Sequence, residues 1–305
     1  MTHPACAACA EPAVYLDRAT GEHLCGDHLA ARVEETFGAT LRGPGGLSGG
    51  ERVAVAFSGG KDSSVLLHLL ATLAAPELGL ALVAVTVDEG IAGYRDETVA
   101  WARTLAGGLG VEHRVIGFEE ACGSDLDVLV RGREGRACTF CGVLRRRLLQ
   151  QAAHELGADR LATGHCLDDE AESVVMNWLR GDVYRVAGAR PTGGESMVPR
   201  TKPLARLPEK EVVSYALLHD LAPELPECPY AHHALRSGIR GLVHRAERQS
   251  PGTLARIVAG QAELEARLRG LLPPAGFSTC PDCGEPVLGG PCRACGLLGG
   301  ALEKH

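Results

Sequence analysis

The stretch that decides the fold reads Arg52-Val53-Ala54-Val55-Ala56-Phe57-Ser58-Gly59-Gly60-Lys61-Asp62-Ser63. Residues 52–57 are rich in Val and Ala, which predicts a buried strand, and the apolar residues 65–73 predict a helix after it. Glycines between a strand and a helix let backbone N–H groups face outward, and the helix start adds partial positive charge. The stretch therefore predicts an anion-binding loop over residues 58–63.

The alternative is an ordinary strand–helix turn, with Gly59 and Gly60 for tightness and Ser63 as the helix cap. Such a turn requires neither the lysine at position 61 nor the aspartate at position 62, so the presence of Lys61 and Asp62 favours the anion-binding loop. The motif is neither a Walker A loop nor a Rossmann fingerprint, because it matches neither Gly-x4-Gly-Lys-Ser nor Gly-x-Gly-x2-Gly.

Apolar segments downstream predict the rest of an α/β domain. Strands are expected over residues 82–87, 111–116 and 160–164, and helices over residues 96–109 and 143–156. Strands that alternate with helices imply a doubly wound parallel sheet, with ligands bound at the carboxyl ends of its strands.

Length and composition bound the organisation of the chain. Its 305 residues, 45% of them hydrophobic, suffice for one α/β core with a small module at each end. We expect an N-terminal zinc finger with a linker helix over residues 1–45, a central domain over 46–272 and a zinc ribbon over 273–305. No charged-then-apolar leader opens the sequence, and its longest apolar run, residues 78–87, is too short for a bilayer. A cytoplasmic protein without a membrane segment is therefore expected.

The charge pattern leaves nucleic-acid binding open. A net charge of −7 argues against broad, nonspecific binding, but it permits a local basic face. Arginines bunch in two places, either as solvated helix faces or as a contact surface for a phosphate backbone. These arginines are Arg131, Arg133, Arg136, Arg145, Arg146 and Arg147, and then Arg236, Arg240, Arg245 and Arg248.

Cysteine pairs at both ends of the chain predict structural zinc. In a reducing compartment, Cys-x2-Cys pairs indicate metal ligands or redox centres better than disulfides. The first set has the spacing Cys-x2-Cys-x15-Cys-x2-His and precedes a predicted helix over residues 30–41 and a glycine-rich linker. The second set has two pairs separated by eight residues, as in a zinc ribbon. The predicted ligands are Cys6, Cys9, Cys25 and His28, and Cys280, Cys283, Cys292 and Cys295.

A third group of thiols lies inside the predicted central domain. Cys138 and Cys141 form a Cys-x2-Cys pair, which by itself could be half a zinc site, a redox dithiol or part of an iron–sulfur site. Cys228 is a distant third thiol followed by a proline. A cluster-free persulfide or disulfide between Cys141 and Cys228 stays open. We expect Cys122 and Cys166 to be buried or incidental thiols.

An acidic motif follows the predicted strand at residues 160–164. It reads Ala162-Thr163-Gly164-His165-Cys166-Leu167-Asp168-Asp169-Glu170-Ala171-Glu172. Small residues at the strand end would admit a nucleotide, and the acids could hold magnesium or orient a substrate. An acidic first turn also complements a helix dipole without any further function. His165 is expected to be packed or hydrogen-bonded rather than a base.

These motifs together resemble known enzymes. Ser-Gly-Gly-Lys-Asp-Ser is similar to the PP-loop of N-type ATP pyrophosphatases, and Thr-Gly-His-x-Leu-Asp-Asp-Glu-Ala is similar to their second signature. Cys-x2-Cys with a distant Cys-Pro resembles the iron–sulfur subgroup of tRNA thiolation enzymes. With a zinc module at each end, the chain resembles the TtuA branch of the TtcA/TtuA family over essentially its full length.

The resemblance implies roles for particular residues. Nucleotide contacts are implied for Ala56, Ser58, Gly59, Gly60, Lys61, Asp62, Ser63, Val87, Arg145 and Gly164. Catalytic roles are implied for Asp62, Asp169, Arg145, Cys138, Cys141 and Cys228, the three cysteines holding a [4Fe–4S] cluster with one open iron. ATP with Mg²⁺ and two Zn²⁺ complete the implied cofactors. Arg145 stands where relatives carry a lysine that faces the phosphates; arginine keeps the charge but puts any proton transfer in doubt.

The resemblance also implies a reaction and partners. The C2 carbonyl of 5-methyluridine 54 in the tRNA T-loop would be adenylated and then receive sulfur, giving 2-thioribothymidine. The sulfur would come from a ubiquitin-like carrier protein that bears a C-terminal thiocarboxylate, and a homodimer is expected. His28 in place of a fourth cysteine favours position 54. The alternatives are 2-thiolation of wobble uridine 34, a cluster-free PP-loop ligase acting on tRNA, and a zinc-dependent tRNA-binding scaffold.

Overall fold

A parallel sheet forms the centre of the molecule. The computed structural model describes residues 4–188, 197–231, 235–268, 271, 278–283, 286–287 and 290–302. Within them, five parallel strands lie in the order β5-β4-β3-β6-β7. Their bounds are β3 (Arg52–Ala56), β4 (Ala81–Asp88), β5 (Glu112–Gly117), β6 (Arg160–Thr163) and β7 (Arg200–Thr201). The chain runs outward from β3 to β5 and then returns to the other side of β3, so the predicted doubly wound sheet is confirmed.

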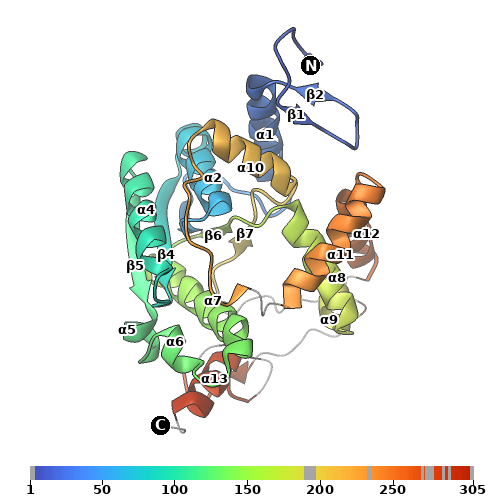
Figure 1. Cartoon of the computed structure of the whole chain (residues 1–305). Coiled ribbons are helices and arrows are strands. Elements are labelled where there is room, and N and C mark those ends of the chain that lie inside the picture. The colour runs from blue at the N-terminus through green and yellow to red at the C-terminus, as the bar shows by residue number, and fades with distance from the viewer. Residues whose placement is uncertain are drawn as a thin grey trace.

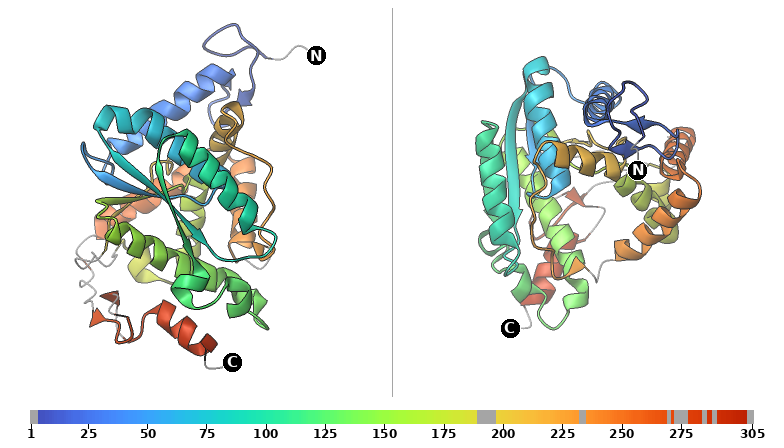
Figure 2. Two further views of the ribbon diagram at one scale, coloured as in Figure 1. Left: turned by 90° about the vertical axis from the view of Figure 1, so that its left-hand side faces the viewer. Right: turned by 45° about the horizontal axis from the view of Figure 1, so that its top comes forward.

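Helices cover both faces of this sheet (Figures 1 and 2). Val53 and Val55 of β3 point to the face covered by α2 and α4, whereas Ala54 points to the face covered by α7. The helices of the central region are α2 (Lys61–Leu69), η1 (Leu70–Ala74), α3 (Ala75–Leu78), α4 (Arg95–Gly108), α5 (Phe118–Cys122), α6 (Leu126–Leu129), η2 (Glu134–Arg136), α7 (Ala137–Glu155), α8 (Leu167–Leu179), α9 (Val183–Val186), α10 (Glu209–Leu218), α11 (Leu235–Gln249) and α12 (Thr253–Leu268).

The N-terminal module shares its core with the sheet. It consists of the hairpin β1 (Tyr15–Leu16) and β2 (His23–Leu24) and the helix α1 (Gly26–Leu41), which begins four residues before the predicted start. The buried side chains of α1 recur every four residues and join one hydrophobic cluster with α2 and α10. These side chains are Leu29, Val33, Phe37 and Leu41.

The C-terminal module packs on α7. It contains the hairpin β8 (Ser278–Thr279) and β9 (Pro286–Val287) and the helix α13 (Arg293–Leu302). Ala294 of α13 is buried in the same cluster as Phe140 and Leu144 of α7. Figure 2 shows the two modules at opposite ends of the molecule. None of the described helices is long and apolar enough to cross a bilayer.

One element boundary differs from the sequence-based expectation in a way that matters. The helix α7 begins at Ala137, not at residue 143, so Cys138 and Cys141 lie in its first two turns. The short strand β7 and the helices α10 and α11 were not anticipated, because two residues of strand leave no periodic signal. The apolar stripe of α12 packs on α8, with Leu254 buried there.

Gly59 is fixed by the backbone around it, which generates a prediction. Its φ is +84°, and a β-carbon there would lie 2.4 Å from the carbonyl oxygen of Thr98 in α4. We expect Gly59→Ala to lower the free energy of unfolding by about 1–3 kcal/mol and to weaken ATP binding, because strain and overlap distort the loop. Gly107→Ala is the matched control, since nothing lies near its β-carbon and alanine favours helix. Denaturant unfolding and calorimetric ATP titration would measure both; equal stability of the two variants would contradict the prediction.

Candidate active site and metal centres

The loop after β3 is closed by its own serines. The Oγ atom of Ser63 donates to the carbonyl of Gly60 at 2.9 Å and accepts from the backbone N–H of Ser58 at 3.2 Å. The N–H of Gly60 donates to Ser58 Oγ at 3.3 Å. Gly60 is extended, and α2 begins at Lys61. The first N–H groups of α2 therefore point out of the loop toward the carboxyl end of the sheet, where an anion is stabilised.

Lys61 lies between two carboxylates. Its Nζ atom is 3.1 Å from Asp62 Oδ2 and 2.9 Å from Glu209 Oε1 of α10. Burial lowers the pKa of Lys61, but these two charges outweigh it and raise the pKa overall. Glu209 also forms an ion pair with Arg240 of α11. Lys61 is therefore protonated and held at the mouth of the loop.

Asp62 has the features of a magnesium ligand. Burial raises its pKa against the opposing effect of Lys61. Its Oδ1 atom is buried and accepts no hydrogen bond from any described residue. An acceptor left open at an anion-binding loop fits a hard cation that accompanies a phosphate.

The second motif touches the first through backbone atoms. A β-carbon on Gly164 would lie 3.1 Å from the carbonyl carbon and oxygen of Asp62, closer than side chains usually pack, so glycine favours this approach. Asp169 Oδ2 accepts from the N–H of Cys166 at 3.1 Å, which closes a capping box at the start of α8. His165 Nδ1 lies 2.9 Å from Thr163 Oγ1, and burial lowers the pKa of His165. A hydrogen-bonded, neutral histidine is what we expected here.

The helix α11 supplies a row of two arginines and a histidine that the sequence did not identify as a site. Arg236 Nη1 lies 3.1 Å from Asp169 Oδ1, and His244 Nε2 lies 3.0 Å from Asp168 Oδ1. With Arg240, these side chains recur every four residues and therefore face one side of α11. The arginines had been read as helix surface or phosphate contacts, and their partners are acids of the second motif and of α10.

One acidic group here could be taken for a cation site. Ligand atoms of Asp168, Glu209 and His244 lie within 4.8 Å of one another. Lys61 and Arg240 both contact Glu209, however, so a divalent cation would meet two positive charges at that carboxylate. We therefore interpret this group as an ion-pair network.

The end of β4 brings a buried acid beside the loop. Val87 is buried, and its carbonyl accepts from Arg95 Nη2 at 2.6 Å, while Arg95 Nη1 donates to the carbonyl of Ser58 at 3.3 Å. Glu89 is 1% exposed and lies between Arg95, at 2.8 Å, and Arg145, at 2.5 Å. Ala56, at the end of β3, is half-buried.

Arg145 has partners other than the expected ones. Its Nη2 atom donates to Cys141 Sγ at 2.9 Å as well as contacting Glu89. Its implied phosphate contact stays a prediction. The arginine belongs to the thiol side of the site in the structure described.

The three central thiols come together beside α7. Cys138 and Cys141 lie one turn apart on α7, and Cys138 Sγ lies 3.5 Å from the carbonyl oxygen of Tyr230, two residues after Cys228. Burial and then the charge of Cys228 raise the pKa of Cys138; burial raises the pKa of Cys141 to about 11, against the effect of Arg145. Bound metal would reverse this by favouring the thiolates.

The spacing of these thiols suits a cluster better than a single ion. In the described residues, two other sets each place four ligand atoms within 4.8 Å of one another, and Cys138, Cys141 and Cys228 are not such a set. Each ligand of a cubane cluster binds a different iron, so its ligands stand farther apart than those of one ion. The donor set, two thiols near the start of α7 and a third from the segment after α10, fits an iron–sulfur cluster.

The two terminal sets fit zinc. Cys9 Sγ lies 3.7 Å from Cys25 Sγ and 3.6 Å from His28 Nδ1. Tetrahedral zinc with its usual bond lengths separates two sulfurs by roughly 3.8 Å. Backbone hydrogen bonding at Cys25, and then at Ala8 and Cys9, lowers the pKa of Cys6 to about 6. The N-terminal ligands are thus preorganised for a metal.

The C-terminal set has the same features. Cys283 Sγ lies 3.6 Å from Cys292 Sγ, and the N–H of Cys292 donates to Cys280 Sγ at 3.1 Å. Hydrogen bonding from Cys292 lowers the pKa of Cys280 to about 6. Cys280, Cys283, Cys292 and Cys295 together place four thiols within reach of one ion. Cys122 and Cys166 are buried, as expected, at 9% and 2% exposure.

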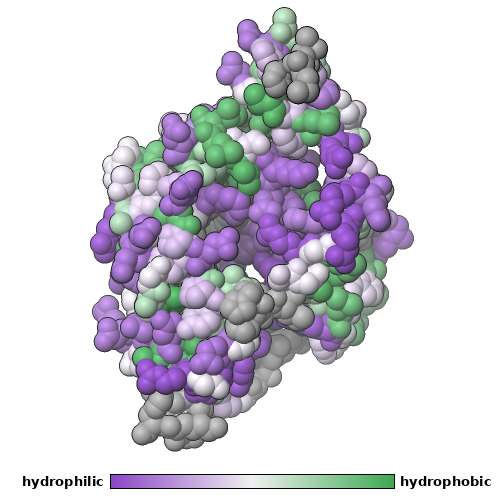
Figure 3. Space-filling model, in the orientation of Figure 1, coloured by the Kyte–Doolittle hydropathy of each residue, from purple (hydrophilic) through white to green (hydrophobic). Residues whose placement is uncertain are grey.

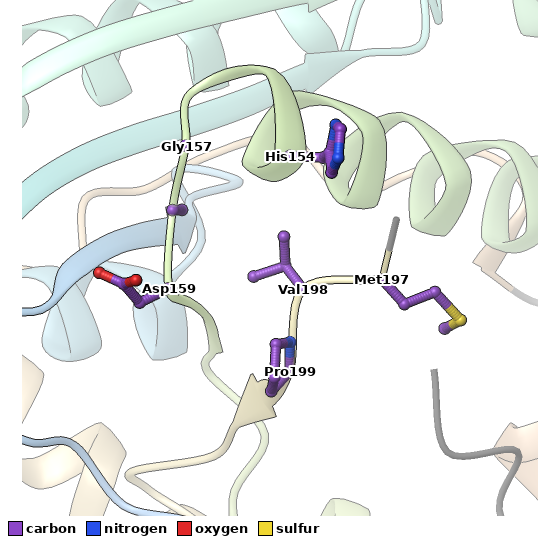
Figure 4. Close-up of a pocket in the computed structure, with 7 residues that line it drawn as sticks. His154, Gly157, Asp159, Met197, Val198 and Pro199 are labelled. Carbon is purple, nitrogen blue, oxygen red and sulfur yellow. The ribbon is translucent and has the colours of Figure 1, made fainter. Parts of the chain in front are cut away.

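The face that carries these groups is hydrophilic. Figure 3 shows polar residues around a hollow near the middle of the molecule. A separate pocket of about 380 Å³ is lined by His154, Asp159, Met197 and Pro199 among others (Figure 4). It lies just before β6 and β7, at the amino ends of the strands, and therefore at the edge of the sheet opposite the loop.

Glu172 generates a prediction about pH. It is fully buried, neither of its oxygens accepts a hydrogen bond from a described residue, and burial raises its pKa to about 7. Because folding raises the pKa of Glu172, the ionised carboxylate destabilises the fold relative to the protonated carboxyl. The stabilisation by the protonated form is complete below about pH 4.5 and is lost as pH rises through 7. We expect Glu172→Gln to raise the free energy of unfolding by about 1–3 kcal/mol at pH 8.

The gain in unfolding free energy of Glu172→Gln should disappear near pH 4.5, where Glu172 in the folded protein is as neutral as the glutamine that replaces it. Glu35→Gln makes the same charge change at an exposed position of α1 and serves as the control. Denaturant unfolding at several pH values would measure both variants. A gain that does not change with pH would contradict the assignment.

The zinc sites generate a prediction about metal content. We expect His28→Ala to lose one zinc ion per chain after dialysis against a mild chelator, because three thiols hold zinc less tightly than a complete tetrahedral set. His23→Ala, in β2 of the same module, removes a histidine outside the ligand set and should keep its zinc. Elemental analysis decides; equal zinc in the two variants would contradict the ligand assignment.

Comparisons with known proteins agree with this geometry. Residues 28–243 match the PP-loop domain family. The chain is 38% identical to the tRNA 2-thiolation protein NcsA of Haloferax volcanii, covering 96% of this chain and 98% of that protein. It is 39% identical to the cytoplasmic tRNA 2-thiolation protein 1 of Bos taurus, covering 98% and 88%.

A solved structure matches along the whole chain as well. It is the U34-tRNA thiolase NcsA from Methanococcus maripaludis with its [4Fe–4S] cluster, with a TM-score of 0.81 and 31% identity, covering 97% of this chain and 96% of that one. The name of this solved structure states U34, which favours the wobble-uridine alternative over position 54 of the T-loop, and none of these three relatives is named for position 54. With a PP-loop beside three thiols and relatives matched end to end, the chain belongs to the PP-loop family, among the tRNA 2-thiolation proteins.

Proposed function

We propose that this protein is a cytoplasmic tRNA sulfurtransferase that converts the C2 carbonyl of wobble uridine 34 to its thiocarbonyl. The observation that carries the proposal is the convergence of three thiols on the edge of the sheet where the PP-loop lies, joined to it through Arg95 and Glu89. A relative solved with a [4Fe–4S] cluster and named for U34 supports both the cofactor and the target.

The nucleotide side of the site activates the base. The N–H groups at the start of α2 and the ammonium of Lys61 hold the phosphates of ATP, and Asp62 with its open Oδ1 binds the accompanying magnesium. Ser58, Gly59, Gly60, Ser63 and Gly164 shape the loop; Ala56 and Val87 lie at the strand ends where the nucleoside fits.

The chemistry is adenylation followed by sulfur transfer. The C2 oxygen of uridine attacks the α-phosphate, and pyrophosphate leaves with its charge neutralised by Lys61 and magnesium. Asp169 lies at the start of α8 beside this loop and orients the acceptor through its contact with Arg236. Sulfur then displaces AMP from C2, which completes the exchange of oxygen for sulfur.

The thiol side supplies the sulfur. Cys138, Cys141 and Cys228 would hold a [4Fe–4S] cluster, which when bound offers an open iron for sulfide. Burial raises the pKa of both Cys138 and Cys141, so the positive charge of the bound iron would be what favours their thiolates. A ubiquitin-like carrier with a thiocarboxylate terminus is the proposed sulfur donor, the two terminal modules hold zinc, and the enzyme acts as a homodimer.

The thiol site generates a prediction. We expect Cys228→Ala to lose the visible absorption of the cluster and to lose tRNA thiolation by at least about a hundredfold, because only two ligands remain. Cys122→Ala removes a buried thiol outside the site and should keep both. Anaerobic reconstitution, iron analysis and thiolation of unmodified tRNA would measure this.

The target and the chemistry are tested together. Mass spectrometry of the product tRNA should find 2-thiouridine at position 34; 2-thioribothymidine at position 54 would restore the other target. Full thiolation by an iron-free preparation would refute the cluster. A tRNA product that carries a group other than sulfur, with release of AMP and pyrophosphate, would indicate a ligase.

A further inference from the structure

We propose that Arg145 and Glu89 are positioning residues of the cluster site, holding the thiolate of Cys141 and joining it to the PP-loop. The inference rests on the proposed function, since it concerns the same three thiols. It assigns Arg145 to the sulfur side of the reaction and gives a role to Glu89, which no sequence motif marked.

The first step is the contact with sulfur. One nitrogen of the guanidinium, Nη2, lies 2.9 Å from Cys141 Sγ and 2.5 Å from Glu89 Oε1. Cys141 Sγ itself lies 3.8 Å from the same carboxylate oxygen. The sulfur of Cys141, the guanidinium of Arg145 and the carboxylate of Glu89 therefore lie close to one another in a triangle. Once the thiol is a metal ligand, the sulfur and the carboxylate would both be negative, and the guanidinium contacts both of them.

The second step is what holds Glu89. The side chain is 1% exposed, so its charge depends on the two cations beside it. Arg95 is 3% exposed and bonds the carbonyls of Ser58 and Val87, which fixes it to the PP-loop and to the end of β4. Glu89 is thus anchored on the nucleotide side and reaches toward the thiol side through Arg145.

The third step is that Arg145 cannot leave Glu89 to contact the phosphates of ATP without a cost in free energy. If its guanidinium left, Glu89 would keep only Arg95, whose Nε atom lies 2.8 Å away without the alignment of a hydrogen bond. A buried carboxylate that loses a partner costs several kcal/mol. Lys61 at the loop has no such restriction, because Asp62 and Glu209 are both partly exposed. The phosphate charge therefore falls to Lys61 and the sulfur contact to Arg145.

The consequence concerns the electronic state of the cluster. Hydrogen bonds to ligating sulfurs and nearby positive charge stabilise the reduced form of an iron–sulfur cluster and raise its reduction potential. Arg145 should raise the potential, and the negative charge of Glu89 should lower it. Removing each in turn should shift the potential in opposite directions.

The experiment uses the full chain, reconstituted anaerobically with iron and sulfide. Arg145→Met keeps the length of the side chain and should shift the midpoint potential to more negative values; Arg145→Lys should fall between it and the unchanged protein. Glu89→Gln keeps the shape and should shift the potential to more positive values. Redox titration monitored by electron paramagnetic resonance measures the potential, and calorimetry measures ATP affinity in the same preparations.

Arg146→Met is the matched control, because it removes an exposed arginine from the next position of α7 and should leave the potential unchanged. Lys61→Met should weaken ATP binding more than Arg145→Met does. Shifts of equal sign in Arg145→Met and Glu89→Gln, or an ATP affinity that falls as far in Arg145→Met as in Lys61→Met, would overturn the inference.

The outcome is separable from that of the proposed function. If the variants show these shifts in reduction potential but the unchanged protein does not thiolate tRNA, the proposed function is refuted and the positioning role of Arg145 and Glu89 stands. A protein that thiolates tRNA with an unchanged potential in Arg145→Met would refute the positioning role alone. Failure of the unchanged protein to take up iron would refute both.

Discussion

The close approach of Gly164 to the backbone of Asp62 and Ser63 is the constraint on which the site depends. It exists because β3 and β6 are adjacent parallel strands, so the loops that follow them leave the sheet side by side. The order of the strands reverses at this point, with β4 and β5 on one side and β7 on the other, so no crossover helix fills the space between the two loops. The phosphate-binding loop and the acidic motif are thereby forced into one site.

This arrangement concentrates charge, and the fold balances it with elements from the C-terminal half. Lys61 and Asp62 meet Glu209 of α10, Glu209 meets Arg240 of α11, and Asp169 meets Arg236. Asp62, Glu209 and Asp169 therefore each have a cationic side chain within ion-pair distance. The network also holds α11 against α8, where only a small apolar cluster, including Ile239 and Val243, lies between them.

The thiol side is built in the same manner at the end of β4. Glu89 is buried between two arginines, one bound to the PP-loop backbone and the other to Cys141. The early start of α7 places Cys138 in its first turn and Cys141 one turn later, beside Glu89 and Arg145. The PP-loop and these thiols therefore lie at the same edge of the sheet, where its strands end.

The sequence by itself determined the doubly wound sheet, the anion-binding loop and the metal-binding sets, because strand and helix periodicity and ligand spacing are local patterns. It placed β3, β4, β5 and β6 within a residue or two, and it singled out the eight terminal cysteine and histidine side chains that the structure brings together in two groups of four. The sequence did not show which basic side chain forms an ion pair with which acidic side chain. Lys61 and Glu209 are 148 residues apart, Asp169 and Arg236 are 67 apart, and Glu89 lies 52 residues from Cys141. Only the tertiary structure decided these pairs, and with them the place of Arg145, because a contact between distant residues depends on strand order and helix packing and leaves no periodic trace in the chain.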